Sequence, residues 1–172
     1  MKTLYLVRHA KSSWESTGLA DVDRPLNKRG EKDAPLMGKV MKKAGIKPDV
    51  ILSSPAVRAI ATAQVIAGKI GYPEEEIIED DGLYRAEVDG LLEVIRGIED
   101  RRKSAMIFGH NPELHELAEA LTDTTIDKLP TCAVVCIEFD VDAWARVARG
   151  GGACKSLDFP KKHRKAKSEE RP

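Results

Sequence analysis

The chain has 172 residues, of which 42% are hydrophobic and 33% are charged, as in an ordinary globular protein of one domain. Its 28 basic and 28 acidic side chains balance, so no overall positive charge attracts nucleic acid or an anionic membrane. The apolar runs are of strand length, too short for a signal peptide or a membrane span. We therefore expect a cytoplasmic protein with no nucleic-acid partner and no membrane partner, and the oligomeric state is left open.

Short apolar runs alternate with segments of helical spacing through most of the chain. The runs that predict strands are residues 3–7, 49–53, 76–79, 104–108, 133–139 and 143–147, with room for one more edge strand after the glycines at 150–152. The segments that predict helices are residues 28–44 (or from Pro35 onward), 56–70, 89–100 and 112–121. This alternation predicts an α/β fold, a three-layer αβα sandwich with a mostly parallel mixed sheet. The pair 133–139 and 143–147 predicts a hairpin, hence antiparallel strands at the C-terminal edge.

Two segments lack the alternation of strands and helices seen in the rest of the chain. Residues 10–27 are polar without periodicity and predict a long loop after the first strand. From residue 161 the chain reads KKHRKAKSEERP, which has no apolar residue beyond Ala166 and cannot bury a core. We therefore expect one domain over residues 1–160 and a basic, mobile tail over 161–172. The tail is a weak candidate for nucleic-acid binding, because Glu169 and Glu170 follow its short basic cluster.

The three cysteines, Cys132, Cys136 and Cys154, give no even set of disulfides and fit reduced thiols in the cytoplasm. Cys132 and Cys136 lie in an apolar stretch, and no second Cys or His pair with zinc-site spacing accompanies them. The sequence therefore predicts neither a metal nor a cofactor.

Basic and imidazole side chains follow three of the predicted strands. Arg8 and His9 end the first, Arg58 lies in the first turn of the helix after the second, and His110 follows the strand 104–108. Ligands of open α/β sheets bind at the carboxyl ends of the strands, so we expect these four side chains to lie close together. Guanidinium groups suit phosphate oxygens, and the helix N-termini expected after Ser54 and Asn111 add partial positive charge.

This cluster predicts a site for a phosphoryl dianion, and the arginines would repel a divalent cation. None of the serines Ser12, Ser13, Ser53 and Ser54 has a clear base beside it in the sequence. A neutral imidazole can instead attack phosphorus and form a phosphohistidine that water then hydrolyses. The arginines and the second histidine would stabilise the charge on the phosphoryl oxygens. Ser12 and Asn111 are further candidates for substrate binding.

Three stretches resemble signatures of the histidine phosphatase (phosphoglycerate-mutase-like) superfamily, in the same order and at similar spacing across residues 4–112. They are VRHA at 7–10, SSPAVRAIATA at 53–63 and GHNP at 109–112. The chain is most similar to the SixA-type phosphohistidine phosphatases, because it is short, has Ala10 in place of glycine, reads DRPLNKRG at 23–30 and lacks large insertions. The resemblance implies that His9 is the nucleophile and that Arg8, Arg58 and His110 surround the phosphoryl group.

The chain departs from the mutase-like pattern at two positions, a phosphate-binding asparagine and the general acid. Mutase-like members often carry an asparagine a few residues after the first signature, where this chain has Glu15. They also carry a glutamate as general acid after the third strand, where residues 79–87 hold no clear motif. The candidates for a general acid are Glu87 and Asp81, with Asp21 or Asp23 from the first loop as another choice.

The missing acid favours one class of substrate. An alkoxide leaving group needs a proton donor worth about 10²–10⁴ in rate, whereas a protonated phosphoimidazole leaves as neutral imidazole without one. The sequence therefore favours phosphohistidine on a protein, such as a histidine phosphotransfer domain or a similar partner. Two alternatives stay open: a small-molecule phosphomonoester phosphatase or mutase on the same scaffold, and a non-catalytic phosphate-binding interaction module.

Overall fold

A six-stranded sheet forms the centre of the protein, in the order β3-β2-β4-β1-β5-β6. The computed structural model describes residues 1–15 and 18–169, with side chains through residue 164. The strands are β1 (Lys2–Arg8), β2 (Val50–Ser53), β3 (Ile78–Glu79), β4 (Ser104–Gly109), β5 (Val134–Phe139) and β6 (Gly152–Asp158). The first four strands run parallel, and β5 and β6 are antiparallel to their neighbours. The predicted mixed sheet with an antiparallel C-terminal edge is confirmed.

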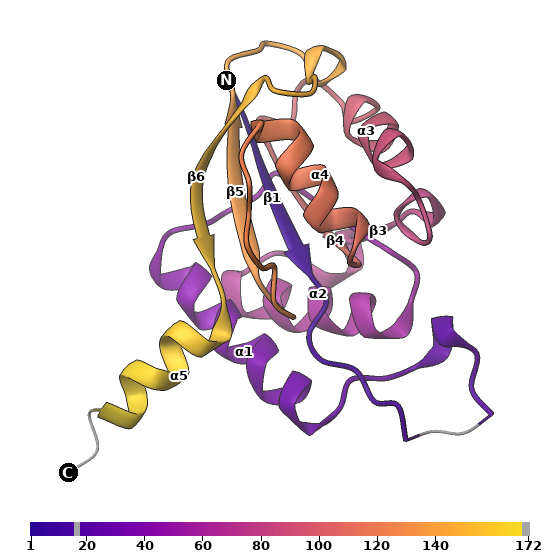
Figure 1. Ribbon diagram of the computed structural model, residues 1–172, viewed down its shortest axis with the longest axis vertical. Coiled ribbons are helices and arrows are strands. Elements are labelled where there is room, and N and C mark those ends of the chain that lie inside the picture. Colours follow the sequence, from indigo (N-terminus) through magenta and orange to yellow (C-terminus); the bar gives the residue numbers. More distant parts are fainter. Residues whose placement is uncertain (16–17, 170–172) are drawn as a thin grey trace.

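Helices cover both faces of this sheet (Figure 1). The α-helices are α1 (Lys28–Lys43), α2 (Val57–Ile70), α3 (Val88–Arg96), α4 (Glu113–Thr122) and α5 (Pro160–Glu169). The short 3-10 turns are η1 (Asp21–Asp23), η2 (Glu74–Glu76), η3 (Asp81–Leu83) and η4 (Trp144–Arg146). Helices α1 and α2 pack on one face, and α3 and α4 pack on the other, so the protein is an αβα sandwich. No helix within the described ranges is long and apolar enough to cross a bilayer.

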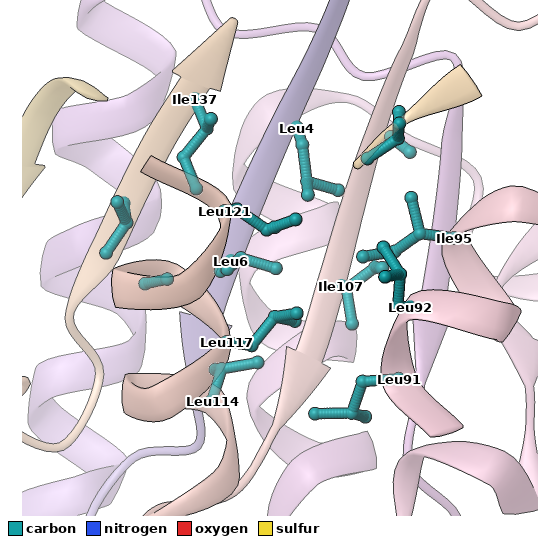
Figure 2. Packing of buried hydrophobic residues seen from close by; sticks show 14 of the residues in the cluster. Leu4, Leu6, Leu91, Leu92, Ile95, Ile107, Leu114, Leu117, Leu121 and Ile137 are labelled. Carbon is teal, nitrogen blue, oxygen red and sulfur yellow. The ribbon is translucent and has the colours of Figure 1, made fainter. Parts of the chain in front are cut away.

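Burial on both faces explains why the central strands are continuous apolar runs. Alternate residues of β1 point to opposite faces, so Leu4 and Leu6 join the α3/α4 core and Val7 joins the α1/α2 core. Figure 2 shows the α3/α4 core, in which leucines of both helices pack against the sheet. The two apolar cores hold β1, β2 and β4 side by side. Because these strands are parallel neighbours, their carboxyl ends meet at one edge of the sheet.

The sequence prediction of a strand over residues 143–147 is wrong, because this segment contains η4. Trp144 is fully buried, with its indole N–H donating to the Arg102 carbonyl at 2.6 Å. Its backbone N–H donates to Asp100 Oδ1 at 2.9 Å. These two bonds hold the segment against the residues that follow α3. The strand that pairs with β5 is β6.

The starts of α2 and α4 differ from expectation, whereas α1 matches the longer of its two predictions. Helix α1 begins at Lys28, with Asn27 as its cap and Pro35 inside the helix. The caps of α2 and α4 are Ala56 and Pro112, neither of which makes a side-chain cap bond. The side chains of Ser54 and Asn111, expected as caps, are instead used in the cleft described below.

The basic segment predicted as a tail forms α5 over Pro160–Glu169, and residues 170–172 lie outside the described part of the chain. Its described side chains contact the domain: His163 Nε2 lies 2.8 Å from Asp158, and Arg164 pairs with the buried carboxylate of Asp33. The lack of apolar residues after position 161 predicted a mobile tail, but these contacts are made by polar and charged side chains.

Candidate active site

The segments that follow β2, β4 and β1 lie side by side, because these strands are neighbours in the sheet. The His9 N–H donates to the Gly109 carbonyl at 3.0 Å, and the Ser54 N–H donates to the Phe108 carbonyl at 3.0 Å. These bonds bring the His9 and His110 rings to a centroid distance of 5.1 Å. Around them lies a cleft of about 420 Å³. Its lining includes Arg8, His9, Lys11, Ser12, Trp14, Asp21, Arg24, Arg58, Tyr84, Arg85, His110, Asn111, Glu113 and Thr131.

His9 is buried, with its imidazole fixed by one backbone contact. Its Nδ1 lies 2.7 Å from the Ala10 carbonyl oxygen, which can only accept a hydrogen bond. The Nδ1–H therefore donates, and Nε2 carries the free lone pair of the neutral ring. Burial lowers the pKa of His9 to about 3, aided by the nearby positive groups. The ring is thus neutral at physiological pH, as a nucleophile must be.

His110 is also held neutral, since burial first and Arg58 next lower its pKa to about 4. Its Nε2 lies 2.7 Å from Ser54 Oγ. Ser54 Oγ also accepts from the Ala56 N–H at 3.2 Å. The other ring nitrogen of His110, Nδ1, is buried with no partner among the described residues. His110 therefore keeps one ring nitrogen without a partner beside the cleft.

Each arginine is anchored through its terminal nitrogens. Arg8 Nη1 donates to the Leu129 carbonyl at 3.0 Å. Arg58 donates through Nη1 to the Asp21 carbonyl at 2.7 Å and through Nη2 to Asp21 Oδ2 at 3.0 Å. The Nε groups of both arginines are buried without a partner in the described part of the chain. Unpaired buried donors of this kind are rare in folded proteins, and an oxyanion would satisfy them.

Asp21 joins the loop after β1 to the rest of the cleft. Its carboxylate accepts from Tyr84 Oη at 2.7 Å and from Arg24 Nε at 3.1 Å, besides Arg58. The Tyr84 hydrogen bond, followed by the Arg58 contact, holds the pKa of Asp21 well below its usual range. Asp21 is therefore ionised and carries no proton to donate.

The two acids expected from the region after β3 lie outside the cleft. Asp81 belongs to η3 and Glu87 precedes α3, and both are exposed and absent from the lining. Asp23 is absent from it as well. The carboxylates that line the cleft are Asp21 and Glu113. Sequence reasoning missed Glu113, although it begins the helix directly after the GHNP stretch.

The other two predicted binding residues, Ser12 and Asn111, both line the cleft. Ser12 Oγ accepts from Arg24 Nη1 at 3.0 Å, and Asn111 Nδ2 donates to the Leu129 carbonyl at 3.0 Å. The same carbonyl holds Arg8, so Asn111 helps to fix the loop behind that guanidinium. Arg24 was not predicted from residue chemistry, and its only signal was its place in the DRPLNKRG stretch that carries part of the resemblance.

The side chains that the structure describes offer no obvious ligand set for a metal centre. Across residues 1–15 and 18–164, no group of three or more His, Cys, Asp or Glu side chains is placed to hold a metal ion. The cleft instead combines arginines with two neutral imidazoles, a set that suits an oxyanion.

Residues 4–89 match the family model described as the Histidine phosphatase superfamily (branch 1). The chain belongs to this superfamily. It is 32% identical over 151 residues to an uncharacterized chloroplastic protein of Arabidopsis thaliana, covering 83% of this chain and 69% of that protein. It is also 41% identical over 73 residues to the 2,3-bisphosphoglycerate-dependent phosphoglycerate mutase of Thermobifida fusca, covering 41% of this chain and 30% of the mutase.

Solved structures extend the likeness over nearly the whole chain. The candidate phosphohistidine phosphatase SixA from Agrobacterium tumefaciens has a TM-score of 0.77 at 26% identity and covers 92% of this chain and 98% of its own. The protein histidine phosphatase SixA complexed with tungstate has a TM-score of 0.81 at 19% identity, covering 94% and 99%, and shares the fold. The superfamily assignment made from three sequence motifs is confirmed.

Proposed function

We propose that this protein is a phosphatase that removes the phosphoryl group from phosphohistidine on another protein, through a phosphohistidine intermediate on His9. The observation that carries the proposal is the tautomer of His9: its Nδ1–H is fixed on the Ala10 carbonyl, which leaves Nε2 as a nucleophile in a cleft of arginines. Burial keeps this imidazole neutral, so no separate base is needed to activate it.

Two steps account for the reaction. First, His9 Nε2 forms a bond to phosphorus while the phosphorus–nitrogen bond of the substrate breaks, and the electron pair returns to the substrate imidazole. Second, water attacks phosphorus while the bond to His9 Nε2 breaks and its electron pair returns to the imidazole, and inorganic phosphate leaves with the protons of the water. In both steps the unpaired Nε donors of Arg8 and Arg58 stabilise the charge on the equatorial oxygens, with His110 beside them.

Phosphohistidine is favoured over an ester because none of the acids expected from the sequence is a ready proton donor in the cleft. Asp21 is ionised, and Glu87 and Asp81 lie outside the lining. A protonated phosphoimidazole leaves as neutral imidazole and needs no proton from the protein. The likeness in fold to SixA structures supports the same substrate class.

A second candidate function is hydrolysis of small phosphomonoesters. It is favoured by Glu113, a carboxylic acid in the cleft lining, and by the sequence likeness to phosphoglycerate mutases. In that reaction Glu113 would protonate the leaving alkoxide.

The nucleophile is tested by trapping. Wild-type protein mixed briefly with a ³²P-phosphohistidine protein and quenched in alkali should retain label that is stable to base and lost in acid. His9→Ala should retain none, because no other imidazole in the cleft is presented in the same way. Label on the alanine variant at the wild-type level would rule out His9 as the nucleophile.

The substrate class is tested by comparing kcat/KM for a phosphohistidine protein and for p-nitrophenyl phosphate in wild type, Glu113→Gln and the exposed control Glu116→Gln. We expect the phosphohistidine protein to be hydrolysed faster, with little change in Glu113→Gln. Faster hydrolysis of the ester, with a loss of about 10²-fold or more in Glu113→Gln alone, would favour the second candidate instead.

A further inference from the structure

A second cavity of about 650 Å³ adjoins the cleft and shares Lys11, Ser12 and Trp14 with it. The rest of its lining comes from the segment after β1 and from the start of α1: Ser13, Glu15, Pro25, Leu26, Asn27, Lys28, Arg29 and Glu31. In Figure 1 this indigo segment leaves the end of β1 and extends away from the sheet before α1 begins. The two adjoining cavities, together called the docking groove, extend from the phosphoryl site to the first turn of α1.

Trp14 stands between the two parts of the groove and is 79% exposed. The guanidinium of Arg24 lies 3.6 Å from the centroid of its indole ring. Arg24 is itself buried and bonded to Asp21 and Ser12, so the exposed indole rests on a fixed support. An exposed, supported tryptophan is a typical anchor of a protein interface, because burying its large ring gives affinity at little entropic cost.

Trp14 is the most exposed of the large hydrophobic side chains in the described part of the chain, which are Met1, Trp14, Leu19, Val57 and Ile78. Of these five, Trp14 lines both cavities. An exposed indole beside a polar cleft favours contact with a surface larger than a small ester.

The charge of the docking groove differs from that of the whole chain. Its two cavities are lined by seven basic side chains, Arg8, Lys11, Arg24, Lys28, Arg29, Arg58 and Arg85, and by four acidic ones, Glu15, Asp21, Glu31 and Glu113. The chain as a whole has a formal net charge of +0. Lys28 and Arg29 also occupy the first turn of α1, where the helix dipole disfavours cations. The phosphoryl dianion accounts for the basic side chains of the first cavity, and carboxylates of a partner would pair with the exposed Lys28 and Arg29 beyond it.

We propose that the docking groove binds the protein substrate, by taking an acidic and partly apolar surface beside its phosphohistidine. This inference rests on the proposed function and adds the part of the substrate that is recognised. The phosphoryl group and its imidazole occupy the first cavity, an apolar side chain of the partner packs on Trp14, and its carboxylates pair with Lys28 and Arg29. A small phosphate ester fills only the first cavity and makes none of the other contacts.

The test compares the charge-reversed pair Lys28→Glu/Arg29→Glu with the pair Lys42→Glu/Lys43→Glu, exposed at the far end of the same helix. The quantity is kcat/KM for a phosphohistidine protein divided by kcat/KM for free phosphohistidine. We expect this ratio to fall at least tenfold in the groove variant, mainly through KM, and to match the wild type in the control. If the groove variant has the same ratio as the control variant, the docking proposal is wrong and the proposed function still stands. A wild type that hydrolyses neither substrate would overturn both.

Binding gives an independent readout that does not depend on turnover. The chain has two tryptophans, of which Trp144 is fully buried and Trp14 is exposed. Adding a tryptophan-free phosphohistidine protein to His9→Ala should shift the emission of Trp14 to shorter wavelength, and His9→Ala/Trp14→Phe should show no shift. Saturable binding without any change in Trp14 emission would contradict contact at the groove.

Discussion

Two local causes act in the same direction on His9, the proposed nucleophile. Burial disfavours the charged ring, and the hydrogen bond to Ala10 selects the tautomer with a free Nε2. Neither cause is visible in the motif Arg8-His9, which gives only the residue type at the strand end. Asp21 illustrates the opposite case, because its contacts with Tyr84 and Arg58 hold its pKa low and keep it charged.

The state of Asp21 yields a prediction about its role. Asp21→Asn keeps an oxygen that can accept from Arg58 and removes one negative charge from the cleft. We expect inorganic phosphate to inhibit this variant more strongly, by a few-fold, and phosphohistidine hydrolysis to change by less than tenfold. Steady-state kinetics with phosphate as inhibitor measure both. A loss near 10³-fold in kcat would mean that Asp21 acts as the proton donor, against the low pKa.

At the scale of elements, the first turn of α1 controls the path of the segment after β1. The Asn27 side chain caps α1 by accepting from the Gly30 N–H at 2.9 Å, and the Asn27 N–H donates to the Lys11 carbonyl at 3.0 Å. A Cβ placed on Gly30 would lie 2.2 Å from that same carbonyl oxygen. Gly30 is therefore required for the close approach that sets Lys11 and Ser12 in the cleft.

This contact predicts opposite outcomes for two glycine substitutions in helices. A Cβ placed on Gly68 in α2 would have nothing within 4 Å, so Gly68→Ala should stabilise the protein by about 0.5–1 kcal/mol through helix propensity. Gly30→Ala should instead destabilise it by about 1–3 kcal/mol, because a backbone atom cannot move aside cheaply. Urea unfolding measures both values. Equal stabilisation in the two variants would show that the Lys11 contact is loose.

At the scale of the whole molecule, two imidazoles are buried between the sheet and its covering segments in a neutral form. The ordinary histidine pKa of about 6.5 falls to about 3 for His9 and about 4 for His110. Between those limits the unfolded chain binds protons that the folded protein does not, so folding stability rises with pH. Stability is thus lost as the pH falls from about 6.5 toward 4.

The pH dependence is checked by urea unfolding at pH 7 and pH 4.5. We expect the wild type to lose stability over this interval, by up to about 1.4 kcal/mol per pH unit for each buried histidine. His9→Gln should lose less, because glutamine has no proton to gain. The exposed control Glu116→Gln should keep the wild-type dependence. A slope unchanged by His9→Gln would mean that His9 titrates normally.

Much of the fold follows from local patterns of residues. Apolar runs buried on both faces identify β1, β2, β4 and β5, and the spacing of apolar residues identifies α1 to α4. The strand predicted over 143–147 failed because Trp144 and Val147 are buried in the α3/α4 core and the segment turns as η4 rather than pairing with β5. Helix α5 was missed because the pairing of Arg164 with Asp33 helps to anchor it, and pairing between distant residues leaves no periodic signal.

The sequence by itself determined that His9, His110, Arg8 and Arg58 share one site, since parallel strands place their carboxyl ends at one edge of the sheet. Tertiary structure alone decided which loop residues complete the site. Asp21, Arg24 and Tyr84 line the cleft because of the paths that their segments take, and these paths depend on contacts far apart in the chain. Glu113 lines it because α4 begins there, beside the end of β4. Tertiary structure also decided the protonation of the site, because burial and hydrogen bonding, rather than residue type, set the charge of each imidazole.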